Sequence, residues 1–406
     1  MSSNFSRRSF LGATGLGLAS LGMGQVALAQ AAKDGELIQG FEQAATTENT
    51  HKDWKPISDR KIRVGIVGWG VCQFGSAFGF QDHPNVEVVA VSDLFPDRCA
   101  NLAKECRCKK TYPSLEELVK DENIEAVFVA TDAPSHARHC IDALKHGKHV
   151  ATCVPAIWGS LEEAHELYEV VKKSNLTYMM FETSVFHEDL YAMKQIYDAG
   201  LFGKIIYSEG EYYHFMPTPI DSYKGWRIGN PPQWYPTHSN AYHIGVTGGS
   251  FTEVSCQGMP SIIDFLKPEN NPYKNPFGTE VALFRTNDGG MSRMAVSWDT
   301  PAEITAGERG RIRGQKAAFD GQFDPAYGQE KVALPNIIRP ALPPTVQPGG
   351  HGGSHGYLMN EFVTAIIEKR KPLVDIATAL NMTVSGVVAH SSALKDGETM
   401  KIPQFA

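Results

Sequence analysis

The sequence has no run of basic residues, and its charges are spread along the whole chain. Its 406 residues include 38 Lys and Arg against 45 Asp and Glu, which gives a formal charge of −7. Nucleic acids and anionic membranes attract basic patches, so neither is expected as a partner. A hydrophobic content of 42% with 20% charged residues is typical of a folded protein, and this length suffices for two domains.

The seven cysteines lack the paired spacing of a disulfide framework. An odd number leaves at least one thiol free. Cys106 and Cys108 are too close in sequence for an unstrained bridge, and they lack the other ligands of a zinc site. The sequence therefore predicts no metal bound by cysteine.

The first 30 residues have the features of a targeting segment. The twin-arginine motif SRRSFL at residues 6–11 precedes a stretch rich in Gly and Ala and the small-residue cleavage site ALA at residues 27–29. The apolar stretch is too short and too rich in glycine for a transmembrane helix, so no membrane insertion is expected. We expect residues 1–30 to be a signal peptide and the mature protein to be periplasmic or secreted.

The segment from Ile62 to Asp93 is the most informative part of the chain. It reads as a buried strand, a glycine loop, a short helix, a second strand and an acid. Gly68 permits the tight turn after the first strand, and Gly70 lets the backbone approach a pyrophosphate at the helix N-terminus. The carboxylate of Asp93 suits the adenosine ribose hydroxyls and would repel a 2′-phosphate, which favours NAD.

The glycine pattern itself is imperfect. Gln73 stands in the usual position of the third glycine, and Gly75 follows two residues later. The alternative is an α/β protein with a glycine-rich turn and no nucleotide. The strand–loop–helix–strand–acid order favours the dinucleotide site.

The alternation of strands and helices predicts the fold. We expect an α/β protein with an N-terminal Rossmann domain, a doubly wound parallel sheet, followed by an α+β domain with a mostly antiparallel open sheet. The SLEE segments beginning at Ser114 and Ser160 are predicted capping boxes. The expected parts are an arm at 31–60 that lies across the surface or a neighbouring subunit, the Rossmann domain at 61–182, the α+β domain at 183–354 and C-terminal helices at 355–406. A homo-oligomer is expected.

Ligands of a doubly wound sheet bind beyond the carboxyl ends of its strands. Three such strand ends, with Asp93 at the end of a fourth strand, carry candidate cofactor residues; the alternative for residues 131–136 is a capped turn, and Pro155 could equally be a strand stop. The candidates are Gly68, Trp69, Gly70, Val71, Asp93, Thr131, Ala133, His136, Cys153 and Val154.

The motifs VGIVGWG, VSD, VATDAPSH and HVATCVP, with the order of the second domain, resemble the glucose–fructose oxidoreductase, inositol dehydrogenase and MocA family (Gfo/Idh/MocA). The resemblance runs from Lys61 to the C-terminus. In that family the fifth strand usually ends in Glu-Lys-Pro, whose lysine helps to position and deprotonate the reacting sugar hydroxyl. This chain has Cys153-Val154-Pro155 there, so the lysine is absent.

A replacement for the lysine lies in the segment WYPTHSNAYH at residues 234–243. Pro236 suits the first turn of a helix, which places Tyr235 one turn before His238, with Tyr242 on the same face. A phenol and an imidazole on one helical edge suit proton transfer. The YPTH string is similar to that of the NAD-dependent α-N-acetylgalactosaminidases, in which the tyrosine and histidine act at the sugar. Tyr235 and His238 are the predicted catalytic residues; the alternative is that the aromatics are core.

Other residues are candidates for the substrate site. His214 ends a long strand, Trp226 and Arg227 offer a stacking surface and a fixed donor, and His351 and His355 flank a glycine-rich loop that is expected to close over substrate. Two histidines without a third ligand predict no metal. With Tyr242, the predicted substrate residues are His214, Trp226, Arg227, Tyr242, His351 and His355.

The expected function is NAD-dependent redox chemistry on a carbohydrate or glycoside. Twin-arginine export carries folded, cofactor-loaded proteins, and the periplasm offers no NAD pool. We therefore expect NAD to stay bound and to be regenerated in each cycle, as in glycoside hydrolysis by oxidation, elimination, hydration and reduction. The alternatives are a two-substrate sugar oxidoreductase of the glucose–fructose type and a non-catalytic protein that binds a sugar or nucleotide.

Overall fold

The structure is a computed structural model that describes residues 50–301, 307–326 and 332–406. The predicted signal peptide at 1–30 and the greater part of the predicted arm lie outside the described residues. Within them, none of the helices is long and apolar enough to cross a membrane. All seven cysteines are described, and all seven are free thiols, six of them buried.

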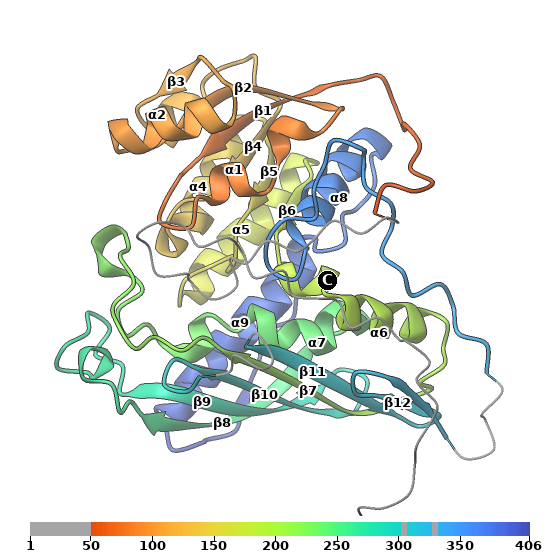
Figure 1. Ribbon diagram of the computed structural model, residues 1–406. Helices are drawn as coiled ribbons and strands as arrows, with labels where there is room; N and C mark the ends of the chain where they lie inside the picture. Colours follow the sequence, from red (N-terminus) through yellow and green to blue (C-terminus); the bar gives the residue numbers. More distant parts are fainter. Residues whose placement is uncertain (1–49, 302–306, 327–331) are drawn as a thin grey trace, which may run out of the picture. The chain divides into compact units, whose positions relative to one another are not determined.

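The N-terminal half contains a six-stranded sheet, sheet A, with the order β3-β2-β1-β4-β5-β6 (Figure 1). Every pair of neighbouring strands is parallel. This confirms the predicted doubly wound Rossmann sheet. The sequence did not point to the two-residue β3. The strands are β1 (Ile62–Val67), β2 (Val86–Ser92), β3 (Thr111–Tyr112), β4 (Ala126–Val129), β5 (His149–Thr152) and β6 (Tyr178–Met180).

Five helices belong to this half: α1 (Phe74–Ala77), α2 (Pro96–Glu105), α3 (Leu115–Leu118), α4 (His136–Lys145) and α5 (Leu161–Ser174). The predicted cap of α5 is present, because the hydroxyl of Ser160 accepts a hydrogen bond from the amide of Glu163. The predicted capping hydrogen bond of Ser114 is wrong. Ser114 is the N-cap residue of α3, but its side chain makes no capping hydrogen bond.

The second half contains the eight-stranded sheet B, with the order β13-β12-β11-β7-β10-β9-β8-β14. Its pairs are antiparallel except β7 with β10, so the prediction of a mostly antiparallel sheet is confirmed. Four of these strands were not predicted: β11, β12, β13 and β14. The strands are β7 (Ile205–Tyr213), β8 (Phe251–Pro260), β9 (Phe277–Thr286), β10 (Met291–Ser297), β11 (Glu308–Gly314), β12 (Ala317–Phe319), β13 (Phe323–Pro325) and β14 (Met400–Lys401).

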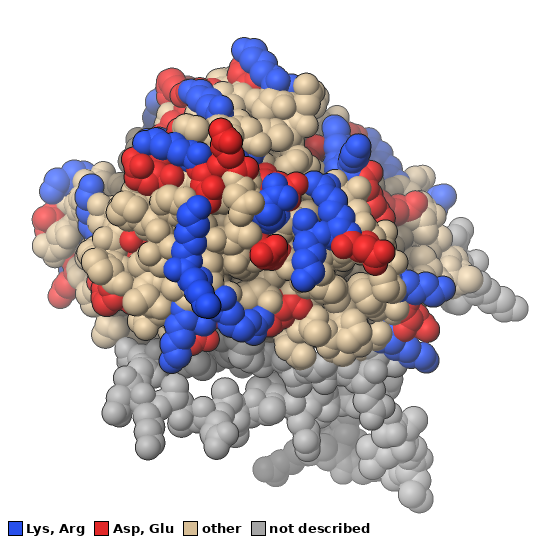
Figure 2. Space-filling model, turned by 90° about the horizontal axis from the view of Figure 1, so that it is seen from above, with Lys and Arg blue, Asp and Glu red and all other residues tan. Residues whose placement is uncertain are grey.

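Four longer helices pack around sheet B and the end of sheet A: α6 (Glu188–Asp198), α7 (Thr237–Thr247), α8 (His355–Glu368) and α9 (Ile376–Ala393). Helix α7 lies on β7, β10 and β11, and α9 contacts β8, α7, α5 and β6. Every residue of α7 from 237 to 246 is buried. Figure 2 shows Lys and Arg interspersed with Asp and Glu on the face that it displays, in keeping with the mixed charge of the sequence.

The glycine loop after β1 has the geometry that a dinucleotide needs. Gly68 has φ +100°, and a Cβ there would lie 2.3 Å from the carbonyl oxygen of Ala130. Gly70 has φ +59°, and its nearest neighbour would be 4.0 Å away, so its backbone is open to a ligand. At Gly75 a Cβ would lie 2.3 Å from the carbonyl oxygen of Gly68. Gly75 therefore serves the close packing that a third glycine provides, in place of Gln73.

Helix α1 is a single turn of four residues. The sequence led us to expect a pyrophosphate at a helix N-terminus, but one turn carries little of a helix macrodipole. We therefore expect the amide groups of the loop to contribute to anion binding alongside the N-terminus of α1.

We expect Gly75→Ala to weaken NAD binding by roughly tenfold or more, since its methyl group would displace the carbonyl of Gly68 and with it the loop. Gly79→Ala is the matched control. Gly79 has φ +78° with nothing within 4 Å, so that variant costs backbone strain of about 1–2 kcal/mol without moving the loop. Isothermal titration of the two apoproteins with NAD compares their affinities, and equal affinities would contradict this role for Gly75.

Candidate functional site

A cleft opens at the carboxyl ends of β1, β2 and β4, where ligands of doubly wound sheets bind. One wall is the glycine loop, and the opposite wall is the segment 221–227 that follows β7. Eight of the residues predicted from sequence line this cleft: Gly68, Trp69, Gly70, Val71, Asp93, Thr131, Trp226 and Arg227.

Asp93 stands at the adenosine end predicted for the cofactor. Its Oδ2 accepts a hydrogen bond from the amide of Trp69 at 2.7 Å, and its Oδ1 accepts one from the amide of Phe95 at 2.9 Å. These bonds fix the carboxylate at the rim of the cleft, with lone pairs left for ribose hydroxyls. Together with the open backbone of Gly70, the site fits a dinucleotide.

Four predicted cofactor residues do not line this cleft: Ala133, His136, Cys153 and Val154. His136 is buried, with Nδ1 2.8 Å from the carbonyl oxygen of Pro155 and Nε2 3.1 Å from that of Thr131. Both ring nitrogens are therefore engaged with backbone, so His136 ties the ends of β4 and β5 together. Cys153 and Val154 are buried directly after β5.

Arg227 lies at the inner end of the cleft. Its guanidinium is 3.8 Å from Sγ of Cys72 and 4.3 Å above the ring of Trp226. Among the described residues no carboxylate forms an ion pair with it. The face of Trp226 that was predicted to stack on a sugar is therefore covered by Arg227, whose guanidinium also contacts Cys72 and Tyr235.

Tyr235 lies next to Arg227 in an aromatic cluster. Its ring centroid is 6.0 Å from that of Tyr212, 6.4 Å from that of Trp226 and 5.6 Å from that of His238. Burial raises the pKa of Tyr235, and the charge of Arg227 lowers it only in part. The phenol thus keeps its proton at neutral pH and is a hydrogen-bond donor.

His238, in the first turn of α7, is held by buried acids. Its Nδ1 is 2.8 Å from Oε1 of Glu182 and 3.9 Å from Oε1 of Glu308. The side chains of His238, Glu182 and Glu308 are 4%, 0% and 7% exposed. Burial alone would lower the pKa of His238, but Glu182 and Glu308 raise it to about 9. At neutral pH the ring is therefore an imidazolium, and together with Tyr235 it can donate protons.

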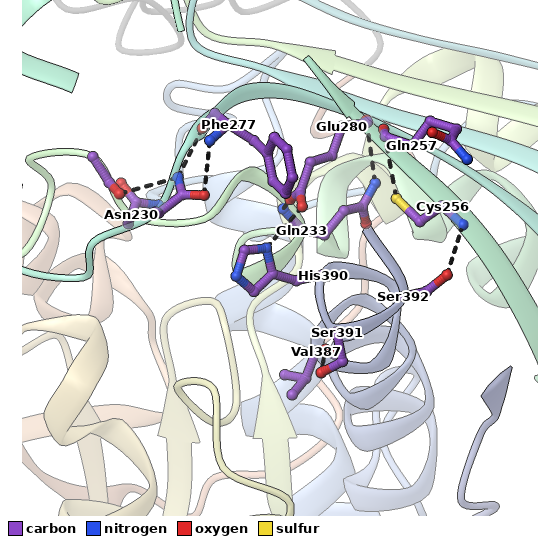
Figure 3. Close-up of polar contacts among 12 residues, drawn as sticks. Asn230, Gln233, Cys256, Gln257, Phe277, Glu280, Val387, His390, Ser391 and Ser392 are labelled. Atoms are coloured by element: carbon purple, nitrogen blue, oxygen red, sulfur yellow. Dashed lines mark hydrogen bonds and ion pairs between the residues drawn. The ribbon is translucent and has the colours of Figure 1, made fainter. Parts of the chain in front are cut away.

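The turn that carries Tyr235 is fixed from two sides (Figure 3). Oε2 of Glu280, on β9, accepts a hydrogen bond from the amide of Gln233 at 2.8 Å, while its Oε1 lies 2.7 Å from Nδ1 of His390 on α9. Helix α9 approaches so closely that a Cβ on Gly386 would lie 2.1 Å from the carbonyl oxygen of Gln233. Pro236, predicted in the first turn of α7, is its N-cap residue.

The remaining predicted substrate residues fall into three places. His214 is buried close to His238 and Arg227, and burial, followed by the charges of Arg227 and His238, lowers its pKa to about 4. Tyr242 lies on α7, where its ring packs against Gly310 of β11, away from the cleft.

His351 and His355 lie against helix α1. Nδ1 of His351 is 2.9 Å from Nε2 of His355, and His355 stacks on Phe78 at 4.2 Å. Arg339 donates hydrogen bonds to the carbonyls of Gly352 and Gly353, which anchors the loop. No group of three or more metal-ligating side chains occurs among the described residues.

Sequence reasoning missed Glu182, Glu308, Ser184 and Cys72. Glu182 is the second residue after β6, so the rule of strand ends applied to the other parallel strands would have found it. Glu308 lies on a strand that was not predicted, and no local signal marks it.

The raised pKa of His238 predicts a dependence of stability on pH. The folded protein binds the His238 proton more tightly than the unfolded chain, whose pKa is about 6.5. The added stability, on the order of 3 kcal/mol, is full below about pH 6.5 and is lost as pH rises through 9. Urea unfolding of the parent and of His238→Gln at pH 6 and pH 9 checks this, and a constant difference between them would contradict it.

Residues 62–182 match the Gfo/Idh/MocA oxidoreductase family, NAD-binding Rossmann fold. Glycosyl hydrolase family 109 protein 1 of Bacteroides fragilis (strain YCH46) is 29% identical over 177 residues, covering 41% of this chain and 38% of that protein. The chain thus matches well under half of that relative's length. A glycosyl hydrolase family 109 protein of Solibacter usitatus (strain Ellin6076) is 23% identical over 387 residues, covering 85% of this chain and 88% of that protein.

Solved structures share the fold of both halves. Levoglucosan dehydrogenase in complex with NADH and levoglucosan has a TM-score of 0.70 at 19% identity and covers 85% of this chain and 100% of that one. For scyllo-inositol dehydrogenase from Lactobacillus casei with bound NAD(H) and scyllo-inositol, the TM-score is 0.62 at 19% identity, with coverages of 84% and 99%. At such identities the likeness shows the fold alone. The match to the Gfo/Idh/MocA oxidoreductase family thus lies in the NAD-binding Rossmann domain, residues 62–182.

Proposed function

We propose that the protein is an NAD-dependent enzyme that acts on a carbohydrate at a hydroxyl-bearing carbon and that ends its cycle with the cofactor in its starting state. Glycoside hydrolysis by oxidation, elimination, hydration and reduction is the reaction that fits best. When bound, NAD supplies a hydride acceptor that can later return the hydride. The glycosyl hydrolase family 109 names of the relatives support this proposal.

The observation that carries the proposal is the cluster of Tyr235, His238 and Arg227 next to the cofactor cleft. Tyr235 and His238 both hold protons at neutral pH, and Arg227 offers at the cleft a cation that pairs with no carboxylate of the described residues. Such a cluster can bind sugar oxygens and protonate a leaving group. A protein that only binds a sugar has no need of an imidazolium held by two carboxylates.

Val154 supports the assignment of proton transfer to this cluster. It occupies the position where the family resemblance places a lysine, and it is 7% exposed. A valine exchanges no proton, so the work of the lysine falls to other side chains.

We also propose that the protein is exported through the twin-arginine pathway with NAD already bound. The support is the motif at residues 6–11, which lies outside the described residues. An exported protein without a surrounding NAD pool requires a cycle without net oxidation.

The test begins with the full chain as purified. Absorbance and mass spectrometry after denaturation should reveal one bound NAD per chain, and a panel of nitrophenyl glycosides should yield released nitrophenol without net NADH. If NADH accumulates and is reoxidised only when a second sugar is added, the protein is a two-substrate oxidoreductase instead. Bound NAD with neither release nor reduction across a broad panel would indicate a binding protein.

We expect Tyr235→Phe and His238→Ala each to lower turnover by about 10²–10⁴-fold, the usual effect of removing a general acid or base, while NAD stays bound. His243→Gln is the control. It removes a buried histidine of the same helix, which stacks on Phe251 and lies 3.1 Å from Ser208. Near-normal turnover of both site variants on a substrate of the parent would show that this is not the reacting site.

Asp93→Asn should narrow the preference for NAD over NADP, because it removes the charge that repels a 2′-phosphate, while its single carbonyl oxygen can still accept one of the two backbone hydrogen bonds. The control is Asp97→Asn, an exposed carboxylate in the first turn of α2. The measurement is the affinity of each apoprotein, parent and variants, for NAD and for NADP. If the parent binds NAD and NADP equally well, Asp93 does not select the cofactor.

A further inference from the structure

His238 contacts more polar groups than a histidine of the protein core needs. Around its Nδ1 lie Oε1 of Glu182 at 2.8 Å, Oγ of Ser184 at 3.3 Å and Oγ1 of Thr183 at 3.5 Å. Oε1 of Glu308 follows at 3.9 Å. These groups come from the segment after β6 in sheet A and from β11 in sheet B.

The hydrogen bonds determine which ring nitrogen carries a proton. The single hydroxyl proton of Ser184 is donated to Oε2 of Glu308 at 2.6 Å, so toward His238 this hydroxyl can only accept. Oε1 of Glu182 also accepts the amide of Ser184 at 3.0 Å. Nδ1 therefore faces acceptors and must be the donor.

The opposite nitrogen, Nε2, has no hydrogen-bond partner among the described residues. The neighbouring rings are those of Tyr212, at 4.5 Å between centroids, and Tyr235. With Nδ1 committed to Glu182, Nε2 is the one ring atom that can give a proton to a ligand or take one from it.

We propose that Glu182 is the positioning residue of His238 and that Glu308, held by Ser184, supports it. The two carboxylates fix the Nδ1–H tautomer and stabilise the imidazolium, so that Nε2 is the proton-exchanging atom. When the N–H bond at Nε2 breaks and an O–H bond forms on the ligand, a neutral ring with Nδ1–H remains. The assignment of Nε2 to catalysis rests on the proposed function, whereas the carboxylate–imidazole arrangement does not.

His238 faces charged and titratable groups from several elements: the tyrosine rings are Tyr212 and Tyr235, and Glu308 also lies 3.4 Å from Nδ1 of His187. Glu182 and Glu308 raise its pKa, while Arg227, His214 and His351 oppose them. Burial lowers the pKa of both His214 and His351, so these two are neutral at pH 7. Although burial raises the pKa of Glu182, its charge pairing and hydrogen bond with His238 lower it overall. The carboxylates thus outweigh the single cation Arg227.

The test is ¹⁵N NMR of the imidazole groups in the full chain as purified, with the His238 signals assigned from the spectrum of His238→Gln. In the parent, both ring nitrogens of His238 should be protonated at pH 7, and deprotonation near pH 9 should leave the proton on Nδ1. In Glu182→Gln the midpoint should fall by at least one pH unit, and in Glu308→Gln by a smaller amount. Glu280→Gln, which alters the other buried glutamate–histidine pair, should leave the titration of His238 unchanged.

Several outcomes would overturn the inference. These are a neutral His238 at pH 7 in the parent, a proton that stays on Nε2 above the midpoint, or a midpoint that neither Glu182→Gln nor Glu308→Gln moves. If Glu182→Gln fails to fold, the protonation state of His238 in the parent and the titration midpoint of Glu308→Gln still test the inference. If the NMR result is as expected but His238→Ala retains turnover, the positioning arrangement stands and the proposed catalytic role of His238 fails.

Discussion

The contact between Glu182 and His238 is the constraint on which the rest of the site depends. Glu182 follows the last strand of sheet A, and His238 begins the helix that lies on sheet B, so one buried bond joins the two sheets. A fully buried carboxylate without a partner costs several kcal/mol, which makes this register of the two halves strongly preferred. The same register brings Tyr235, three residues before His238, to Arg227 and hence to the cofactor cleft. The packing of α9 against Gln233 and Pro236 fixes the turn that carries Tyr235.

The charges of the cluster restrict what can bind there. The cluster holds two carboxyl groups, Glu182 and Glu308, beside the cationic side chains of His238 and Arg227, and His187 lies 3.4 Å from Glu308, so acids and bases are both present without a ligand. A neutral molecule with many hydroxyl groups can enter without leaving an uncompensated buried charge, whereas a dianion would require further cations. Tyr235, His238 and Arg227 all present donors, which complement the oxygen atoms of a sugar. The electrostatics therefore agree with a carbohydrate as substrate on grounds independent of any relative.

Local sequence signals predicted the Rossmann half well, because a glycine loop, an acid at a strand end and β-branched runs each act within a few residues. Gly68, Gly70 and Asp93 line the cleft as expected. The pattern could not show that Gly75 takes the role of the third glycine, since that depends on the carbonyl of Gly68. His136 looked like a ligand by its position, yet two carbonyl groups occupy its ring. Glu308 lay beyond reach because its placement depends on the pairing of β11 with β7, a contact across some hundred residues that no local pattern encodes.

Val154 stands where the family resemblance places a lysine, and the loss of that lysine changes which side chains can bind charge and exchange protons at the site. A lysine near the reacting centre can serve both as a cation and, with a lowered pKa, as a base. In this chain Arg227 can supply the cation, but a guanidinium does not deprotonate and so cannot serve as a base. Under the proposed function the two roles are thereby separated: Arg227 supplies the positive charge, while proton exchange falls to groups that can release a proton near neutral pH. Of the side chains beside Arg227, Tyr235 holds its proton strongly, whereas the pKa of His238 lies within about two units of neutrality. His238, oriented by two carboxylates, is thus the group best able to change its protonation state during a reaction at this site.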